Sequence, residues 1–257
     1  MFRRFAPGLV RVAPVFAALL VFGQGGDLDA RQAAAPTAKE VIARHVKAMG
    51  GEAAFKQVKS IRARGVFSMA AQNISGEFEM VAERPNKLLL KVTVPGFGSI
   101  ESGFDGKVGW TIEPVSGPAL TTGRQLAELK DDAYFDAPLH GPDHVKDATL
   151  MGTETFDNRK ATKMKVVFLS GNEQVEYFDV ESGLQIGFEA SRETPMGVVP
   201  TTGFFRNYQK FQNVLMPATL VQRGLGIEQV LQVNSYDFNT VPAGAFDMPP
   251  SIKALIK

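Results

Sequence analysis

A run of alternating apolar and polar residues near the middle of the chain constrains the fold more than any other feature. The segment from Gly152 to Leu184 reads GTETFDNRKATKMKVVFLSGNEQVEYFDVESGL. A period of two places successive side chains on opposite faces of a β-strand, so the apolar residues between 162 and 168 share one face and the lysines share the other. Turn residues at 170–172 and 182–183 separate the runs. The segment therefore predicts an antiparallel meander with one buried face.

The same period of two occurs on both sides of this meander. It begins at Ser60 and continues to Ile112, with Asp105-Gly106 as a strong hairpin signal, and we divide this region into five strands. Pro114 to Pro118 breaks the pattern, and strands resume from Lys146. Since no helical crossover separates consecutive strands within either half, we expect antiparallel order and about eleven strands in total.

Helical signals are confined to two places. Thr37 and Glu40 form a capping-box pattern before a helical apolar stripe that ends at Gly50-Gly51, and a short helix is expected over Glu52 to Val58. A third helix is expected over Arg124 to Ala133. A sheet of about eleven strands must curl, so we predict a mainly β (α+β) fold: a strongly curved antiparallel sheet forming an incomplete barrel, with the N-terminal helices and the inserted helix covering its concave face.

The first residues are typical of an export signal. Three arginines precede the apolar run Val12 to Phe22, which has the length of a signal-peptide core and is too short to span a bilayer unaided. We divide the chain into a cleaved signal peptide (1–25), a linker (26–36) and one domain (37–257). Cleavage near Ala30 or Ala35, or an uncleaved N-terminal anchor, are the alternatives.

Charge and cysteine content exclude several classes of protein. The 28 basic and 27 acidic residues give a formal net charge of +1, which provides no extended basic footprint for nucleic acid. The absence of cysteine excludes disulfides, thiolate metal sites and a lipidated N-terminal cysteine. No hydrolase, phosphate-loop or calcium-loop motif is present in the sequence. We therefore expect neither catalytic residues nor a cofactor.

The histidines and a group of aspartates are candidates for metal binding or acid/base catalysis. His140, Asp143 and His144 include residue types that hold zinc, but Pro142 bars the helix that would align them, so we expect a solvated loop and no metal. Asp131, Asp132 and Asp136 are the residue type of an acid/base pair, although a solvated helix end explains them more simply. His45 is expected to be a packed histidine.

Aromatic, methionine and leucine residues fall on the predicted apolar face. Such side chains line a ligand cavity or fill an ordinary core, and the alternation does not distinguish these outcomes. In the inserted helix, Leu126 and Leu129 would face the sheet, as would Tyr134 and Phe135 just after it. The candidates for a hydrophobic cavity are Phe67, Met69, Phe78, Met80, Phe97, Trp110, Leu126, Leu129, Met164, Phe168 and Phe188. Apolar residues between Gly and Pro at 94–100 and 194–200 suggest a lid or a docking lip.

Three short motifs and the order of elements resemble the LolA/LolB-like outer-membrane lipoprotein-sorting family. The motifs are Glu83-Arg84-Pro85-Asn86-Lys87-Leu88, Phe104-Asp105-Gly106-Lys107-Val108-Gly109-Trp110 and Tyr177-Phe178-Asp179-Val180-Glu181-Ser182-Gly183-Leu184. The resemblance covers Thr37 to Ile252 and implies a half-open barrel that holds acyl chains in the periplasm. It also implies an arginine in the cavity that helps to set release, for which the candidates are Arg62, Arg64 and Arg84.

These observations lead to one main hypothesis and two alternatives. The main one is a periplasmic, non-catalytic carrier of a lipid or an acylated lipoprotein, working as a monomer and binding no nucleic acid. Burial alone supplies the affinity, because each methylene moved out of water contributes about 0.8 kcal/mol. One alternative is an envelope interaction module with a filled core that binds a protein partner through its apolar loops. The other is a metal-dependent hydrolase built on His140, Asp143 and His144.

Overall fold

The computed structural model describes residues 35–194 and 197–256; the expected signal peptide lies outside the described residues. Four α-helices are present in this part of the chain: α1 (Ala38–Ala48), α2 (Glu52–Lys56), α3 (Gly123–Ala133) and α4 (Pro250–Lys253). Two 3₁₀ helices are η1 (Ala70–Gln72) and η2 (Ala137–Leu139). The strands of the first half are β1 (Ser60–Met69), β2 (Ile74–Glu83), β3 (Lys87–Val94), β4 (Gly98–Phe104), β5 (Gly109–Glu113) and β6 (Gly117–Thr121). Those of the second half are β7 (Val145–Phe156), β8 (Arg159–Phe168), β9 (Glu173–Asp179), β10 (Gln185–Thr194), β11 (Gly197–Phe211), β12 (Val214–Gly224) and β13 (Ile227–Phe238).

All thirteen strands belong to one antiparallel sheet in the order β6-β5-β4-β3-β2-β1-β13-β12-β11-β10-β9-β8-β7. Every neighbouring pair is consecutive in sequence except β1 and β13, which join the two halves. The register shifts between Arg64 and Gly65 in this joint. The edge strands β6 and β7 are therefore consecutive in sequence and twelve places apart in the sheet, and α3 lies in the connection between them.

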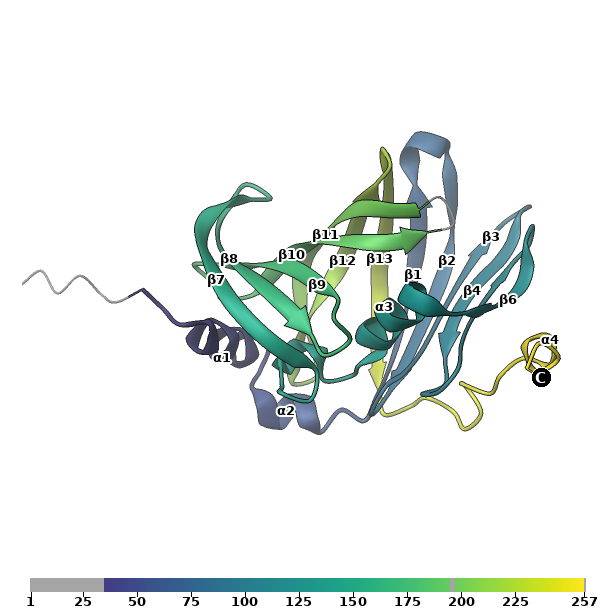
Figure 1. Ribbon diagram of the computed structural model, residues 1–257, viewed down its shortest axis with the longest axis horizontal. Helices are drawn as coiled ribbons and strands as arrows, with labels where there is room; N and C mark the ends of the chain where they lie inside the picture. Colours follow the sequence, from purple (N-terminus) through teal and green to yellow (C-terminus); the bar gives the residue numbers. More distant parts are fainter. Residues whose placement is uncertain (1–34, 195–196, 257) are drawn as a thin grey trace, which may run out of the picture. The chain divides into compact units, whose positions relative to one another are not determined.

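The sheet curves around α3. This helix contacts β3 and β4 on one side and β10 on the other, although these strands are far apart in the sheet order. Figure 1 shows α3 in front of the sheet, with α1 beside β7 and β8 and α2 below β1. The expected mainly β fold, an incomplete barrel with helices on its concave face, is therefore confirmed.

The described part of the chain has thirteen strands, whereas the sequence predicts about eleven. The main omission is β6, because Pro114 and Pro118 were interpreted as a break. Pro118 instead pairs with Ile112 in the outermost strand of the sheet, where one face of the backbone has no neighbour and a missing N–H costs little. The capping box at Thr37 and Glu40 is present as predicted.

The core divides into three clusters, and two of them lie on the concave face. The third includes Phe156, Tyr177, Ile186 and Phe204. Under α2 and the segment after α3, a cluster centred on β1, β2 and β13 includes Phe55, Phe78, Phe135 and Tyr236. Under α1, the side chains of Met164, Val166, Phe168 and Phe178 pack against Val41. The meander thus buries the apolar residues of β8 that the alternation placed together.

The opposite face of the β1–β6 half also has a buried patch. Trp110 follows Gly109 and precedes Thr111, both of which point to the concave side, so its ring points to the outer face. There it lies over Gly103, where a Cβ would stand 2.3 Å from the indole ring. The C-terminal α4 contacts β6, and its Ile252 is fully buried. In the part of the chain that the structure describes, no helix is long and apolar enough to cross a membrane.

The joint between β1 and β13 yields a test of the fold. A Cβ at Gly65 would lie 1.9 Å from the carbonyl oxygen of Gln232 and 2.8 Å from the ring of Phe78. We expect Gly65→Ala to lower the free energy of unfolding by roughly 1–3 kcal/mol, because the joint must shift to admit the methyl group. Chemical denaturation measures the loss, with Val66→Ala on the outer face as the control. Equal stability of the two variants would contradict this account of the joint.

Candidate functional site

A cavity of about 530 Å³ lies between α3 and the concave face of the sheet. Its wall comes from both halves of the sheet and from α3, and it combines apolar side chains, mostly from the sheet, with polar ones that include Gln125, Glu128 and Asp132 of α3. The lining side chains include Phe67, Leu90, Val92, Ser102, Thr111, Leu129, Phe188, Phe205, Leu220 and Leu231. Polar residues close to the hairpin ends, such as Glu113 and Gln229, complete it. Its volume lies within the range of small-molecule binding sites.

Different forces hold the two sides of α3. Toward β5 the contact is apolar: Leu126 and Leu129 lie over Gly109, where a Cβ would stand 2.9 Å from each leucine. Toward β10 the contact is polar, because the Glu128 carboxylate accepts a hydrogen bond from the backbone N–H of Glu193 at 3.1 Å. Further polar contacts are those of Arg124 with the carbonyl of Ser191 (2.9 Å) and of Arg192 with Asp132 (3.0 Å). The helix is thus a cover fixed along both of its long sides.

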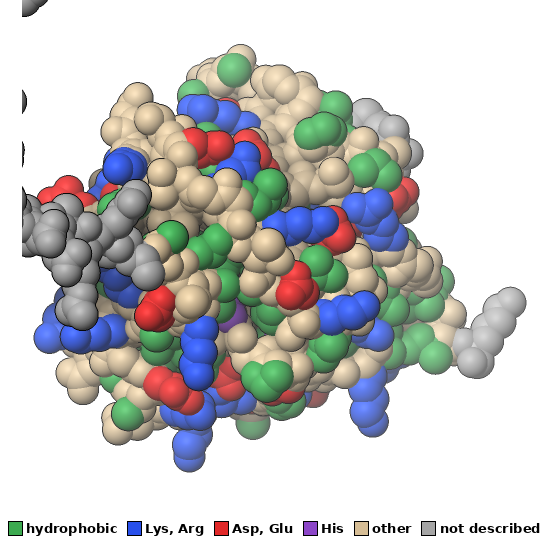
Figure 2. All heavy atoms as spheres, turned by 60° about the vertical axis from the view of Figure 1, so that its left-hand side comes forward, with side chains coloured by type: hydrophobic (Ala, Val, Ile, Leu, Met, Phe, Trp, Pro, Cys, Tyr) green, Lys and Arg blue, Asp and Glu red, His purple; other side chains and the backbone are tan. Residues whose placement is uncertain are grey.

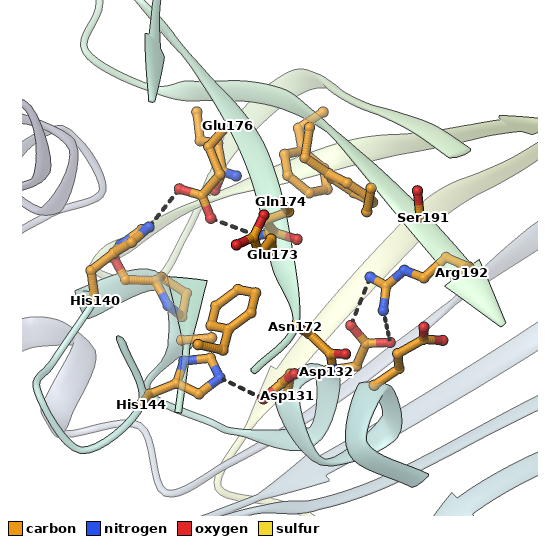
Figure 3. A pocket seen from close by; sticks show the side chains of 18 residues that line it. Asp131, Asp132, His140, His144, Asn172, Glu173, Gln174, Glu176, Ser191 and Arg192 are labelled. Atoms are coloured by element: carbon orange, nitrogen blue, oxygen red, sulfur yellow. Dashed lines mark hydrogen bonds and ion pairs between the residues drawn. The ribbon is translucent and has the colours of Figure 1, made fainter. Parts of the chain in front are cut away.

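A second, polar pocket of about 250 Å³ adjoins this cavity. The walls of both include Glu128, Asp132, Phe188, Arg192 and Phe205. Figure 3 shows its labelled histidines and carboxylates arranged around the pocket, with Arg192 and Asp132 on one side and His140 on the other. In Figure 2 a histidine side chain is visible at the bottom of a recess among apolar and charged side chains.

His140 and Glu176 form a buried pair in the polar pocket. His140 Nε2 lies 2.6 Å from Glu176 Oε2, and the side chains are 2% and 4% exposed. Burial opposes the charged forms, but the mutual attraction outweighs it, raising the pKa of His140 and lowering the pKa of Glu176. Gln174 also donates to Glu176 at 2.6 Å. Next to them, burial and the neighbouring His140 lower the pKa of His45 to about 4.

His144 is buried between two aromatic rings. It stacks on Tyr134 at 4.4 Å and on Phe168 at 4.7 Å between ring centroids. Its Nε2 lies 3.6 Å from Asp131 Oδ1, and neither ring nitrogen has a hydrogen-bond partner among the described residues. Burial raises the pKa of Asp131, but contacts with His144, Ser170 and Asn172 outweigh it and lower that pKa overall.

The expectation of a solvated loop at His140 and His144 was wrong, as was that of a solvated helix end at Asp131. The segment after α3 folds back onto the concave face, so the two histidines stack and pair there. His45 is buried as expected and accepts a hydrogen bond from the backbone N–H of Gln185 at 3.2 Å. The hydrolase alternative lacks its geometry: His140 faces Glu176, His144 faces Asp131, and Asp143 bonds to Tyr134 outside the pocket. The described residues contain no group of three or more that would hold a metal ion.

The predicted apolar residues lie at six places. Phe67, Leu129 and Phe188 line the cavity, and Leu126 lies in the apolar contact of α3 with Gly109. Met69, Phe78 and Met80 belong to the adjoining core cluster, and Met164 and Phe168 to the cluster under α1. Trp110 was expected in the cavity but lies on the outer face, because alternation in β5 turns it away. Phe97 is 52% exposed at a hairpin tip.

Phe97 is one of several apolar residues exposed at one end of the sheet. The antiparallel order brings the tips of the β3–β4, β5–β6, β10–β11 and β12–β13 hairpins to the same end. These tips carry Phe97, Val115, Val198 and Leu225, whose exposed fractions are 52%, 85%, 52% and 56%. We call these four residues the apolar rim. The 194–200 loop considered in the sequence contributes Val198, while residues 195–196 lie outside the described residues.

None of the three candidate arginines lines the cavity. Arg62 and Arg64 alternate with Ile61 and Ala63 and pair with Glu79 on the outer face. Arg84 donates to the carbonyl oxygens of Val58 and Phe55 and pairs with Asp136, and so ties α2 to the segment after α3. The arginine that does line the cavity is Arg192, which the sequence analysis missed. Its position two and four residues after Ala190 and Phe188 was the available signal, since alternation puts all three on one face.

Comparison with known structures supports the fold independently. The chain is similar to a LolA superfamily protein from Nitrosomonas europaea, with a TM-score of 0.55, 13% identity, and coverage of 83% of this chain and 99% of that one. It is also similar to a DUF1329 family protein from Desulfovibrio piger, with a TM-score of 0.57, 11% identity, and coverage of 82% of this chain and 97% of that one. A third similar structure is an outer membrane lipoprotein-sorting protein domain from Vibrio parahaemolyticus, with a TM-score of 0.51, 11% identity, and coverage of 81% of this chain and 95% of that one. The expected resemblance to the LolA/LolB-like family is thus confirmed for the fold. No family model and no curated protein sequence matches the chain.

The buried His140–Glu176 pair predicts a pH-dependent effect of Glu176→Gln on stability. The raised pKa of His140 contributes stability below about pH 6.5, which is lost as the pH rises through that raised pKa. The lowered pKa of Glu176 contributes stability above about pH 4.5. We expect Glu176→Gln to cost roughly 1–3 kcal/mol near pH 6, and progressively less as the pH rises towards 9.

Chemical denaturation at several pH values measures this difference. Gln174, the carbonyl of Pro138 and His45 also face the pair, and all three are retained in the variant. Glu83→Gln, which removes a half-exposed carboxylate paired with Lys87, is the control and should show little pH dependence. A cost of Glu176→Gln that is the same at pH 6 and pH 9 would rule out the charged pair.

Proposed function

We propose that this chain is an exported periplasmic carrier that holds the acyl chains of a lipid or an acylated lipoprotein in the cavity under α3. The observation that carries the proposal is that cavity, covered by a helix and lined by a group of apolar side chains that includes Phe67, Leu90, Phe188 and Leu231. The LolA-like fold supports the same kind of function, and so does the signal-like N-terminus. The carrier performs no covalent chemistry, and its mature domain begins after the linker at 26–36.

The proposed binding mode follows from the two sides of the cover. The leucine contact with Gly109 and the polar contacts with β10 are made by side chains of α3, which can separate from the sheet without unfolding a strand. An acyl chain that enters under α3 gains about 0.8 kcal/mol for each buried methylene. Because Arg192 pairs with Asp132 across this boundary, we assign it the part in release that the family resemblance suggested for an arginine.

Filling the cavity should reduce acyl binding. Ser102 lines the cavity from β4, and Ser102→Phe would occupy the space of two or three methylenes. The loss of about 2 kcal/mol corresponds to an affinity for a fatty acid that is roughly 30-fold weaker. Displacement of a fluorescent fatty acid measures it. Ser75→Phe, the same change on the outer face of β2, should bind as the unmodified protein does. Unchanged affinity in Ser102→Phe would exclude this cavity.

The apolar rim favours a second candidate function, an envelope interaction module that binds a protein partner. Four exposed apolar residues at one end of a sheet form a surface of the kind that marks protein contacts. In this reading the partner contacts the rim, and acyl binding plays no part.

A rim variant separates the two candidates. If the module reading holds, Phe97→Ser together with Val115→Ser should abolish recovery of a partner cross-linked in the envelope, while fatty-acid binding stays the same. Lys107→Ser, at an exposed turn on the opposite end of the sheet, is the control. A partner recovered equally well with the rim variant would exclude the rim as its binding surface.

A further inference from the structure

Among the charged side chains that line the polar pocket beside the cavity, acids outnumber bases. Its wall includes five carboxylates and a single arginine, Arg192. Three of the carboxylates have a lysine or arginine partner within 3.0 Å. These pairs are Glu128 with Arg124 (3.0 Å), Glu173 with Lys165 (2.7 Å) and Asp132 with Arg192 (3.0 Å). The other two, Asp131 and Glu176, are 10% and 4% exposed and have a histidine ring as their neighbour.

These last two carboxylates differ in how well they are satisfied. Both carboxylate oxygens of Glu176 have a hydrogen-bond partner, because His140 Nε2 lies 2.6 Å from Oε2 and Gln174 Nε2 lies 2.6 Å from Oε1. In Asp131, Oδ2 accepts from Ser170 and Asn172 at 2.7 Å, whereas Oδ1 has His144 Nε2 at 3.6 Å, which is beyond hydrogen-bonding distance. A carboxylate oxygen that lines a pocket without a hydrogen-bond partner favours an additional cationic donor.

His144 is a second, independent indication of a ligand. Its side chain is 7% exposed and lines the pocket, and neither of its ring nitrogens has a hydrogen-bond partner in the described part of the chain. Buried polar atoms are almost always paired, so an imidazole held in place by two stacked rings with both nitrogens unused is a preformed partner for a bound group. Figure 3 shows His144 and Asp131 next to each other at the same end of the pocket.

We infer that this pocket binds the ammonium head group of an amphiphile, at Asp131 and His144, while its chain lies in the cavity under α3. The inference rests on the proposed function for the chain and adds the class of head group. An ammonium group supplies three donors and a positive charge, which match the free oxygen of Asp131 and a ring nitrogen of His144. An anionic head group would meet five carboxylates. The two spaces share the wall at Phe188 and Phe205, so a single molecule would extend past these rings from the pocket into the cavity.

Three amphiphiles with the same chain test the inference: dodecylammonium, dodecanol and dodecanoate. Isothermal titration calorimetry below their micellar concentrations measures each affinity for the mature protein. We expect dodecylammonium to bind at least about tenfold more tightly than dodecanol, because only its head group carries the positive charge that the Asp131 carboxylate attracts. Dodecanoate should be the weakest of the three.

Two variants assign the preference to the pocket. Asp131→Asn keeps the shape and removes the charge, and His144→Phe keeps the stack and removes the ring nitrogens. In each variant, the affinity for dodecylammonium should fall to within about twofold of the affinity for dodecanol. The affinity for dodecanol should stay unchanged, which also demonstrates that the variant is folded. Asp237→Asn is the control, because it removes the same charge from the outer face, where Asp237 pairs with Arg64.

The outcomes distinguish this inference from the proposed function. If all three amphiphiles bind equally well, the cavity holds acyl chains and the head-group site is wrong. If Asp131→Asn and Asp237→Asn weaken the binding of dodecylammonium equally, the preference comes from the overall charge of the protein and the proposed head-group site is again wrong. If none of the three binds, the proposed function fails and the head-group inference fails with it.

Discussion

The pairing of β1 with β13 is the constraint on which the rest of the structure depends. It joins the first and last strands of the chain, so two meanders become one sheet and the strands in the middle of the sequence become its edges. The connection from β6 to β7 must then pass from one edge to the other. It passes across the concave face, and this path brings α3 and the two histidines that follow it over the sheet. The cavity and the polar pocket are both results of that one pairing.

The local elements could be predicted from the sequence because their causes are local. Alternation, turn residues and the capping box at Thr37 are patterns within a dozen residues, and the structure agrees with them. Strand β6 was missed because two prolines carry the same signal in a loop and in an edge strand. The β1–β13 pairing joins segments far apart in the sequence, and no pattern in either strand specifies its partner.

The site was less predictable because it is tertiary. His140 and His144 lie in a segment that contains Pro and Gly, a composition that predicts a solvated loop. Their burial depends on Glu176 and Phe168, which come from the meander. Arg192 was within reach of the same alternation argument that correctly grouped β8. Trp110 shows the converse: a large aromatic residue in a half-buried strand suggests the core, yet the outer face of this sheet has its own buried patch beneath the C-terminal segment.

The open sheet has a further consequence for solubility. A barrel that does not close leaves two edge strands with unpaired backbone groups, and such edges invite pairing with a second molecule. Both edges here are poor templates. Strand β6 has five residues and contains Pro118, and β7 is interrupted by two register shifts and exposes Lys146, Asp147 and Glu154. These irregular edges disfavour the addition of a strand from another copy of the chain, so the sheet stays open without a neighbour that covers its edges.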